Sequence, residues 1–213
     1  MIVDDSIYGQ LEIKSQIIVD LIDLPIFQRL KRISQDGAPH YIQPIRTVTR
    51  YEHSIGVWYL SCRYGRPIEE QIVCLLHDLS HTAFSHVIDF VTKNEKHEFA
   101  DSKLDEMIMK SEIPEIIKRN GLDLRKILNK ESFPLLENCL PDISVDRLDY
   151  FLRDGYTIGF LPKETIKLFL DSLYERENIL FFKEVRVASL LAILFTNFSR
   201  LIWLDPTCLL YTS

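Results

Sequence analysis

A short polar segment gathers side chains that can bind a metal ion or transfer a proton. LLHDLSHTAFSH, residues 75–86, holds three of the six histidines of the 213-residue chain together with Asp78. Imidazole nitrogens and carboxylate oxygens bind divalent ions, and histidine also exchanges protons near neutral pH. The segment therefore predicts a metal site, a proton-transfer site, or both.

The adjacent pair His77 and Asp78 supplies two ligands, which alone bind a metal weakly. His53 and Asp146, on two other predicted helices, would complete a four-ligand set with open positions for water and substrate, as in catalytic metal sites. The alternative is that each histidine packs or caps locally. We favour the shared site because burying several unpaired polar groups is costly.

Helical periodicity indicates which elements must position these ligands. Apolar residues recur around His53 at spacings of three and four, which places it toward the interior of a helix. A helix opened by Pro67 carries a core stripe over residues 68–79, with His77 and His81 on a neighbouring face. Residues 143–155 form a third helix, which Gly155 ends. Its polar side carries Asp146, Asp149, Tyr150 and Arg153.

The remaining pattern is mostly helical, so the predicted fold class is all-α. We expect a small hairpin in SIYGQLEI, a helix start at Asp23 to Pro25, a loop over 36–49, short helices over 99–140, a helix over 164–174, a minor late hairpin over 178–185 and a last helix over 186–204. No linker divides the chain. The prediction is one domain over 1–207, with a core over about 25–160 and the start of a C-terminal helical region over 161–207.

The composition restricts the class of partner and compartment. The formal net charge is −6 and basic runs are short, which argues against nucleic acid as the main partner. The cysteines lack paired spacing, no signal peptide is visible, and Ala188–Phe195 is too short to span a bilayer. We expect a cytoplasmic protein without a membrane partner. CLLYTS, residues 208–213, looks like a translated sequencing adapter, so we expect a fold truncated at its C-terminal end.

Three segments together resemble a known family. TRYEHSIG at 49–56, HDLSHTAFSH at 77–86 and SVDRLDYFLRD at 144–154 are similar, in order, to the signature segments of the HD-domain deoxynucleoside triphosphate (dNTP) triphosphohydrolases. This family includes bacterial dGTP triphosphohydrolases and the vertebrate SAM-and-HD-domain dNTPase. DSIYGQLEI and LIDLPIFQRLKRISQ match its usual beginning. The resemblance implies an HD-domain helical bundle that hydrolyses a nucleotide substrate to deoxynucleoside and triphosphate, by metal-activated water attack on the α-phosphorus.

The resemblance also implies a role for individual residues and an assembly state. It makes His53, His77, Asp78 and Asp146 ligands of a divalent metal, with Mn, Mg, Fe, Zn and Ni all open. It implies that His86 is the general acid, that Asp89 orients it, that His81 and His97 contact phosphates or relay protons, and that Arg50 contacts phosphate. It further implies a substrate-binding set and a homo-oligomer. The substrate-binding set is Gln35, Arg50, Arg147, Tyr150 and Asp154.

Two departures from the family pattern and two rival functions stay open. HDLS stands where HDLG is commoner, a tolerable change unless the backbone there needs a positive φ. Later base- and phosphate-contacting residues are not matched, and Arg200 is only a candidate. One rival is an HD phosphohydrolase or phosphodiesterase acting on another nucleotide. The other is a non-catalytic HD module that binds nucleotides.

Overall fold

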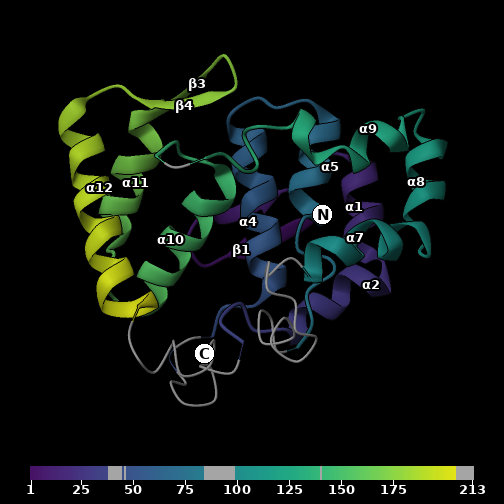
Figure 1. The fold of residues 1–213 in the computed structure, drawn as a ribbon, viewed down its shortest axis with the longest axis horizontal. Helices are drawn as coiled ribbons and strands as arrows, with labels where there is room; N and C mark the ends of the chain where they lie inside the picture. Colours follow the sequence, from purple (N-terminus) through teal and green to yellow (C-terminus); the bar gives the residue numbers. More distant parts are fainter. Residues whose placement is uncertain (38–44, 46, 84–98, 140, 205–213) are drawn as a thin grey trace.

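The computed structural model describes residues 1–37, 45, 47–83, 99–139 and 141–204. Within these residues the chain is mainly helical, with two small antiparallel hairpins that do not join into one sheet (Figure 1). The predicted all-α class and both predicted hairpins are therefore confirmed.

The elements follow one another along the chain in a simple order. The first half contains β1 (Ile2–Asp5), β2 (Gly9–Glu12), α1 (Gln16–Asp23), α2 (Pro25–Gln28), the 3-10 segment η1 (Arg29–Arg32), α4 (Arg50–Arg63) and α5 (Ile68–Leu76). The second half contains α7 (Phe99–Met109), α8 (Ile113–Arg119), α9 (Leu124–Leu128), the 3-10 segment η2 (Lys130–Ser132), α10 (Val145–Thr157), α11 (Lys163–Ser172), β3 (Leu173–Arg176), β4 (Ile179–Phe182), α12 (Val185–Phe198) and the π-helical segment η3 (Ser199–Trp203).

Helix α4 lies at the centre of the molecule and packs against both α5 and α10 (Figure 1). Nine of its fourteen residues are buried, so little of its circumference faces water. Gly56 makes the close approach of α10 feasible, because a Cβ at this position would overlap the side chains of Asp149 and Arg153. The central helix therefore presents polar as well as apolar residues to buried neighbours.

A capping box fixes the start of α4. The Thr49 hydroxyl accepts a hydrogen bond from the Glu52 backbone N–H at 3.2 Å, and the Glu52 carboxylate accepts one from the Thr49 N–H at 2.8 Å. Residue 34 also forms an antiparallel bridge with Thr49. This start determines where Arg50 and His53, in the first turns of the helix, project.

The helix that precedes the HDLSH segment ends earlier than predicted. We expected His77 and His81 on one helical face, but α5 ends at Leu76 and His77 is its C-cap residue. Arg29 donates hydrogen bonds to the carbonyl oxygens of Leu79 and His81. Both carbonyl groups belong to the segment after α5, so Arg29 holds this segment where the chain has already left the helix.

Helix α10 extends past its predicted stop. It continues through Gly155 to Thr157, and Gly159, with a φ of 78°, supplies the left-handed residue that follows. Gly155 has a packing role instead, because a Cβ there would overlap the Leu161 side chain. Asp149 and Arg153, predicted on the polar side of this helix, are fully buried.

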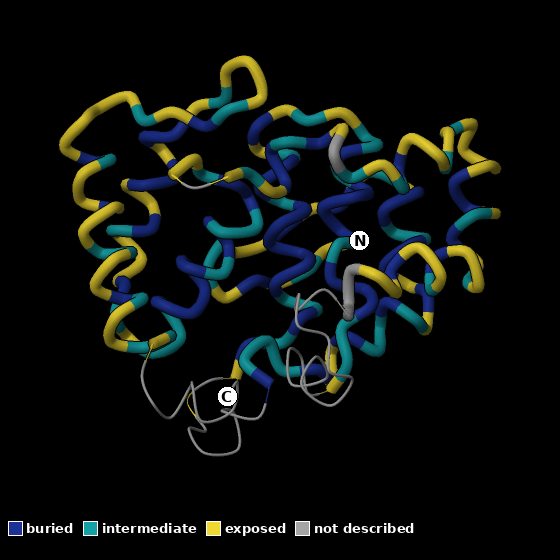
Figure 2. Tube along the Cα trace, viewed as in Figure 1, coloured by how far each residue is buried: buried dark blue, intermediate teal, exposed yellow. Residues whose placement is uncertain are grey.

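The last described helix is longer than its most apolar stretch suggested. Helix α11 ends at Ser172 because the next residues form β3, and the helix that follows β4 runs from Val185 to Trp203 without interruption. By length and composition these 19 residues could cross a membrane, whereas the most apolar stretch of the sequence, Ala188–Phe195, is too short to do so. Much of this helix is exposed along one edge of the molecule (Figure 2).

Candidate metal centre

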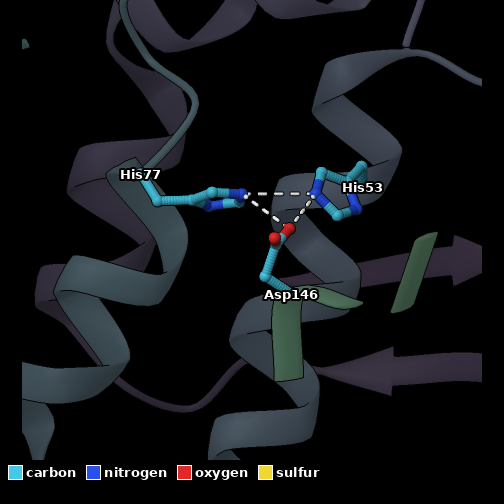
Figure 3. A group of neighbouring side chains, drawn as sticks. All are labelled: His53, His77 and Asp146. Atoms are coloured by element: carbon cyan, nitrogen blue, oxygen red, sulfur yellow. Dashed lines mark hydrogen bonds and ion pairs between the residues drawn. The ribbon is translucent and has the colours of Figure 1, made fainter. Parts of the chain in front are cut away.

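Three side chains from three separate helical segments converge on one point (Figure 3). The Nε2 atom of His53 lies 2.9 Å from Asp146 Oδ1 and 3.2 Å from His77 Nε2. His77 Nε2 lies 3.4 Å from the same Asp146 oxygen. His53 comes from α4, Asp146 from the first turn of α10, and His77 from the end of α5.

Asp78, the fourth predicted ligand, borders the same group. Its carboxylate oxygens lie 3.6 Å from His77 Nε2 and 3.8 Å from His53 Nε2. Arg50 forms an ion pair with this carboxylate at 2.6 Å, and both side chains are buried. The structure thus brings all four predicted metal-binding residues together and adds one cation beside them.

The two histidines are oriented by partners on their other ring nitrogens. His77 Nδ1 hydrogen-bonds the carbonyl oxygen of Cys74 at 2.8 Å, and His53 Nδ1 hydrogen-bonds a carboxylate oxygen of Asp149 at 2.8 Å. A proton on each Nδ1 leaves each Nε2 free to act as a ligand. Two such nitrogens and two carboxylates form a donor set that fits a divalent transition metal.

Carboxylates on both sides of His53 keep its ring protonated on both nitrogens, and therefore positively charged, when no metal ion is bound. Burial disfavours the charged ring, but hydrogen bonds with Asp146 and Asp149 outweigh burial and raise the pKa of His53 to about 10. Burial likewise works against ionised Asp146, yet hydrogen bonds from His53 and His77 hold its pKa below the usual range. The site is therefore built to hold positive charge between its carboxylates.

His81 lies beside this group and differs from His53 in its electrostatics. Its Nε2 lies 3.3 Å from Asp78 Oδ1. Burial and the nearby Arg50 cation lower the pKa of His81 despite the Asp78 carboxylate. The ring is therefore neutral near pH 7. His86, Asp89 and His97, the other predicted catalytic residues, lie outside the described residues.

The predicted substrate-binding residues occupy different surroundings. The backbone carbonyl oxygen of Gln35 accepts a hydrogen bond from Arg50 at 3.4 Å. Gln35 therefore lies next to the predicted metal ligands, since Arg50 also pairs with Asp78. Arg147 is instead engaged by the backbone, because its guanidinium donates to the carbonyl oxygens of Asn138 and Asp142. These bonds hold the Arg147 guanidinium against the chain that precedes α10.

Tyr150 and Asp154 share a neighbour that the sequence analysis did not single out. The indole N–H of Trp203 donates to Asp154 at 3.1 Å, and the Trp203 ring packs edge-on against Tyr150 with centroids 5.2 Å apart. Trp203 lies far along the chain, in η3, and no motif marks it. Its indole covers the two residues that the family resemblance assigns to sugar binding.

Asp149 is the main site-adjacent residue that the sequence analysis missed. It lies three residues after Asp146, in the same helical motif, and it is fully buried. The available signal was its spacing: residues three apart on a helix share a face, so a second carboxylate beside a predicted ligand was an expected neighbour of the metal site.

Comparison with known proteins identifies relatives for most of the chain. The HD domain family matches residues 50–154. The chain is 41% identical over 189 residues to the uncharacterized protein YdhJ of Bacillus subtilis, covering 88% of this chain and 58% of YdhJ. It is 32% identical over 213 residues to the metal-dependent phosphohydrolase cns2 of Cordyceps militaris, covering 97% of this chain and 61% of cns2.

A vertebrate enzyme is a more distant match. The chain is 30% identical over 226 residues to the deoxynucleoside triphosphate triphosphohydrolase SAMHD1 of Xenopus laevis, covering 78% of this chain and 36% of that protein. The chain thus spans about three fifths of the first two relatives and about a third of the vertebrate one. With the HD match and the convergent donor set, the predicted divalent metal cofactor is confirmed, without its identity.

Proposed function

Because the chain contains an HD domain over residues 50–154, we propose that it is a metal-dependent phosphohydrolase that cleaves deoxynucleoside triphosphates into deoxynucleoside and triphosphate. The observation that carries this proposal is the convergence of His53, His77 and Asp146 within 4.8 Å, with Asp78 at their edge. The similarity to a relative named as a deoxynucleoside triphosphate triphosphohydrolase supports the nucleotide substrate.

In this proposal His53, His77, Asp78 and Asp146 hold one divalent metal. When bound, such a metal lowers the pKa of a coordinated water and offsets negative charge on a phosphate oxygen. The two Nδ1 hydrogen bonds keep the Nε2 atoms of His53 and His77 aimed at the site. Arg50 neutralises part of the carboxylate charge that would otherwise repel a triphosphate.

His81 has a distinct part in the proposed reaction. It is neutral near pH 7 and its Nε2 lies 3.3 Å from Asp78 Oδ1, and we assign it to phosphate contact or proton relay beside the metal. We assign the proton to the leaving 5′-oxygen to His86, oriented by Asp89, with His97 as a further phosphate or relay group. Gln35, Tyr150 and Asp154 are assigned to the sugar.

The test is product analysis with purified protein, Mn²⁺ and each of the four dNTPs. We expect deoxynucleoside and intact triphosphate in equal amounts. Pyrophosphate or orthophosphate as the first product would overturn attack at the α-phosphorus and favour another phosphohydrolase. Absence of turnover with bound nucleotide would favour the non-catalytic module.

The metal requirement is tested by changing two ligands at once. His77→Ala with Asp78→Ala removes one imidazole and one carboxylate from the group, so we expect loss of both bound metal and turnover. A matched control is His81→Ala, which keeps the four ligands and should keep the metal while lowering the rate. Metal content of the dialysed proteins, measured by elemental analysis, separates the two cases. Undiminished metal in the double variant would contradict the assigned ligands.

A further inference from the structure

Asp149 forms a second layer around the metal group, on the side of His53 that faces away from His77. Each of its two carboxylate oxygens accepts two hydrogen bonds. Oδ1 accepts from the Tyr8 hydroxyl at 2.8 Å and from Arg153 Nη2 at 2.9 Å. Oδ2 accepts from Arg153 Nε at 2.9 Å and from His53 Nδ1 at 2.8 Å. The acceptor capacity of this buried carboxylate is thus filled.

Arg153 connects this carboxylate to the N-terminal hairpin. Its third nitrogen, Nη1, donates to Asp5 Oδ2 at 3.0 Å, and both side chains are almost completely buried. The other Asp5 oxygen accepts the backbone N–H groups of Ile7 and Tyr8, at 2.8 and 2.9 Å, in the turn between β1 and β2. The turn that presents the Tyr8 hydroxyl is therefore held by the same ion-pair network.

A solely structural ion pair does not account for the position of His53 in this network. Arg153 and Asp5 could neutralise Asp149 without an imidazole on Oδ2, yet His53 Nδ1 takes that place while Nε2 faces Asp146 and His77. A histidine that binds a metal through one nitrogen commonly donates from the other to a carboxylate, which fixes the ring and its tautomer.

We propose that Asp149 is a positioning residue for the metal centre, and that Tyr8, Arg153 and Asp5 hold it in place from the N-terminal hairpin. Asp149 keeps the His53 proton on Nδ1 and fixes the ring plane, so that Nε2 presents its lone pair to the metal. The hairpin β1–β2 is then a part of the metal site, although it supplies no ligand. This proposal rests on the proposed metal centre.

The test compares metal binding by the full chain and three variants, with Co²⁺ as the probe. Asp149→Asn keeps the size of the side chain but no longer offers a charged acceptor to both His53 and Arg153. Tyr8→Phe removes only the hydroxyl on Oδ1. Tyr59→Phe is the matched control, because the Tyr59 ring packs against Tyr8 at 4.8 Å between centroids, and no described bond joins its hydroxyl to Asp149.

We expect the Co²⁺ dissociation constant, measured by calorimetry, to rise about 10- to 100-fold in Asp149→Asn. A smaller rise is expected in Tyr8→Phe and none in Tyr59→Phe. The visible absorption of bound Co²⁺ should also change in Asp149→Asn, because this spectrum reports the ligand arrangement. A merely structural role would lower the melting temperature of the metal-free protein and leave both metal readouts unchanged.

The outcomes separate this proposal from the proposed function. If the unmodified chain binds no Co²⁺, the metal centre itself is refuted. If it binds Co²⁺ and a folded Asp149→Asn variant binds with the same affinity and spectrum, the positioning role is refuted and the metal centre stands. If Asp149→Asn does not fold, Tyr8→Phe decides in the same way, since loss of one hydroxyl leaves the ion pairs intact.

Discussion

At the scale of single residues, the site depends on side chains that are charged and yet buried. Asp149 and Arg153 form a pair in which each residue is at most 1% exposed, and Asp78 and Arg50 form a second buried pair. Removing one member of such a pair leaves an uncompensated charge in a poorly hydrated place, which costs more than the pair contributes. These residues therefore tolerate substitution only when the partner and the available volume change with them.

Gly56 tests this dependence on volume. Gly56→Ala should destabilise the fold by about 1–3 kcal/mol, the usual cost of overfilling a packed interior, because the new methyl group would overlap Asp149 and Arg153. Urea unfolding of the metal-free protein measures this change.

A double-mutant cycle separates overlap from loss of backbone freedom at Gly56. In a protein that already carries Asp149→Ala, the added methyl group overlaps only Arg153 instead of both side chains, so the same Gly56→Ala change should cost less. Equal costs in both backgrounds would show that the Asp149–Arg153 ion pair is not the reason that position 56 needs a glycine.

At the scale of elements, sequence patterns predicted the helices but not all of their ends. The start of α4 is fixed within the local sequence, because Thr49 and Glu52 form a capping box. After α5 ends at Leu76, the HDLSH segment is held by Arg29, whose guanidinium reaches it from about fifty residues away. A contact at that separation leaves no periodic signal, so the sequence extended the helix through His81.

Contacts between residues far apart in the sequence also limited which residues of the site could be predicted. His53, His77, Asp78 and Asp146 stand in motifs and were predicted together, and the structure brings them together. Tyr8 and Trp203 approach α10 from opposite ends of the described chain, so only the fold reveals their contacts with Asp149 and Asp154. Ser80 is absent from the described positive-φ residues, so the HDLS variant of the motif needs no glycine there.

The start of α4 gives a prediction at this scale. Thr49→Ala removes the side-chain acceptor of the capping box, and the loss of such a cap costs about 1 kcal/mol. Thr49→Ser is the matched control, because its hydroxyl can still accept from the Glu52 N–H. In chemical denaturation, the unmodified protein and Thr49→Ser should have similar free energies of unfolding, and Thr49→Ala should have a lower one. Equal stability of all three would show that the bridge at residue 34, not the cap, holds this helix start.

At the scale of the whole molecule, the carboxylates around the metal group connect stability to pH. Asp78 and Asp149 have lowered pKa values despite burial, because the cations Arg50 and Arg153 lie beside them. These groups stabilise the fold above the ordinary aspartate pKa of about 4, and this contribution is lost as pH falls below it. His53 acts in the opposite direction, since its pKa is raised to about 10.

His53 therefore predicts that the metal-free protein loses stability as pH rises from 6.5 toward 10, whereas the lowered pKa of His81 predicts a separate loss as pH falls below 6.5. The ordinary histidine pKa of about 6.5 sets the start of the loss toward high pH. Melting temperatures across this range, in the presence of a chelator, measure it. Saturating Mn²⁺ should remove most of the decline, because the cation takes the place of the His53 proton between the carboxylates.

His53→Gln provides the comparison for this pH profile. It removes the titrating ring while keeping a polar side chain, so the decline between pH 6.5 and pH 10 should flatten in the chelated protein. A decline of the same size in this variant would assign the effect to another group.

The network behind His53 also bears on the order in which the chain folds. Asp5 and Arg153 are 148 residues apart, Tyr8 and Asp149 are 141 apart, and His53 and Asp146 are 93 apart. Contacts of such sequence separation require large loops to close before they stabilise anything, which slows their formation. During synthesis on the ribosome, a nascent chain that has not yet released α10 contains three of the four proposed ligands, His53, His77 and Asp78. The proposed ligand set is therefore complete only after α10 has packed against α4.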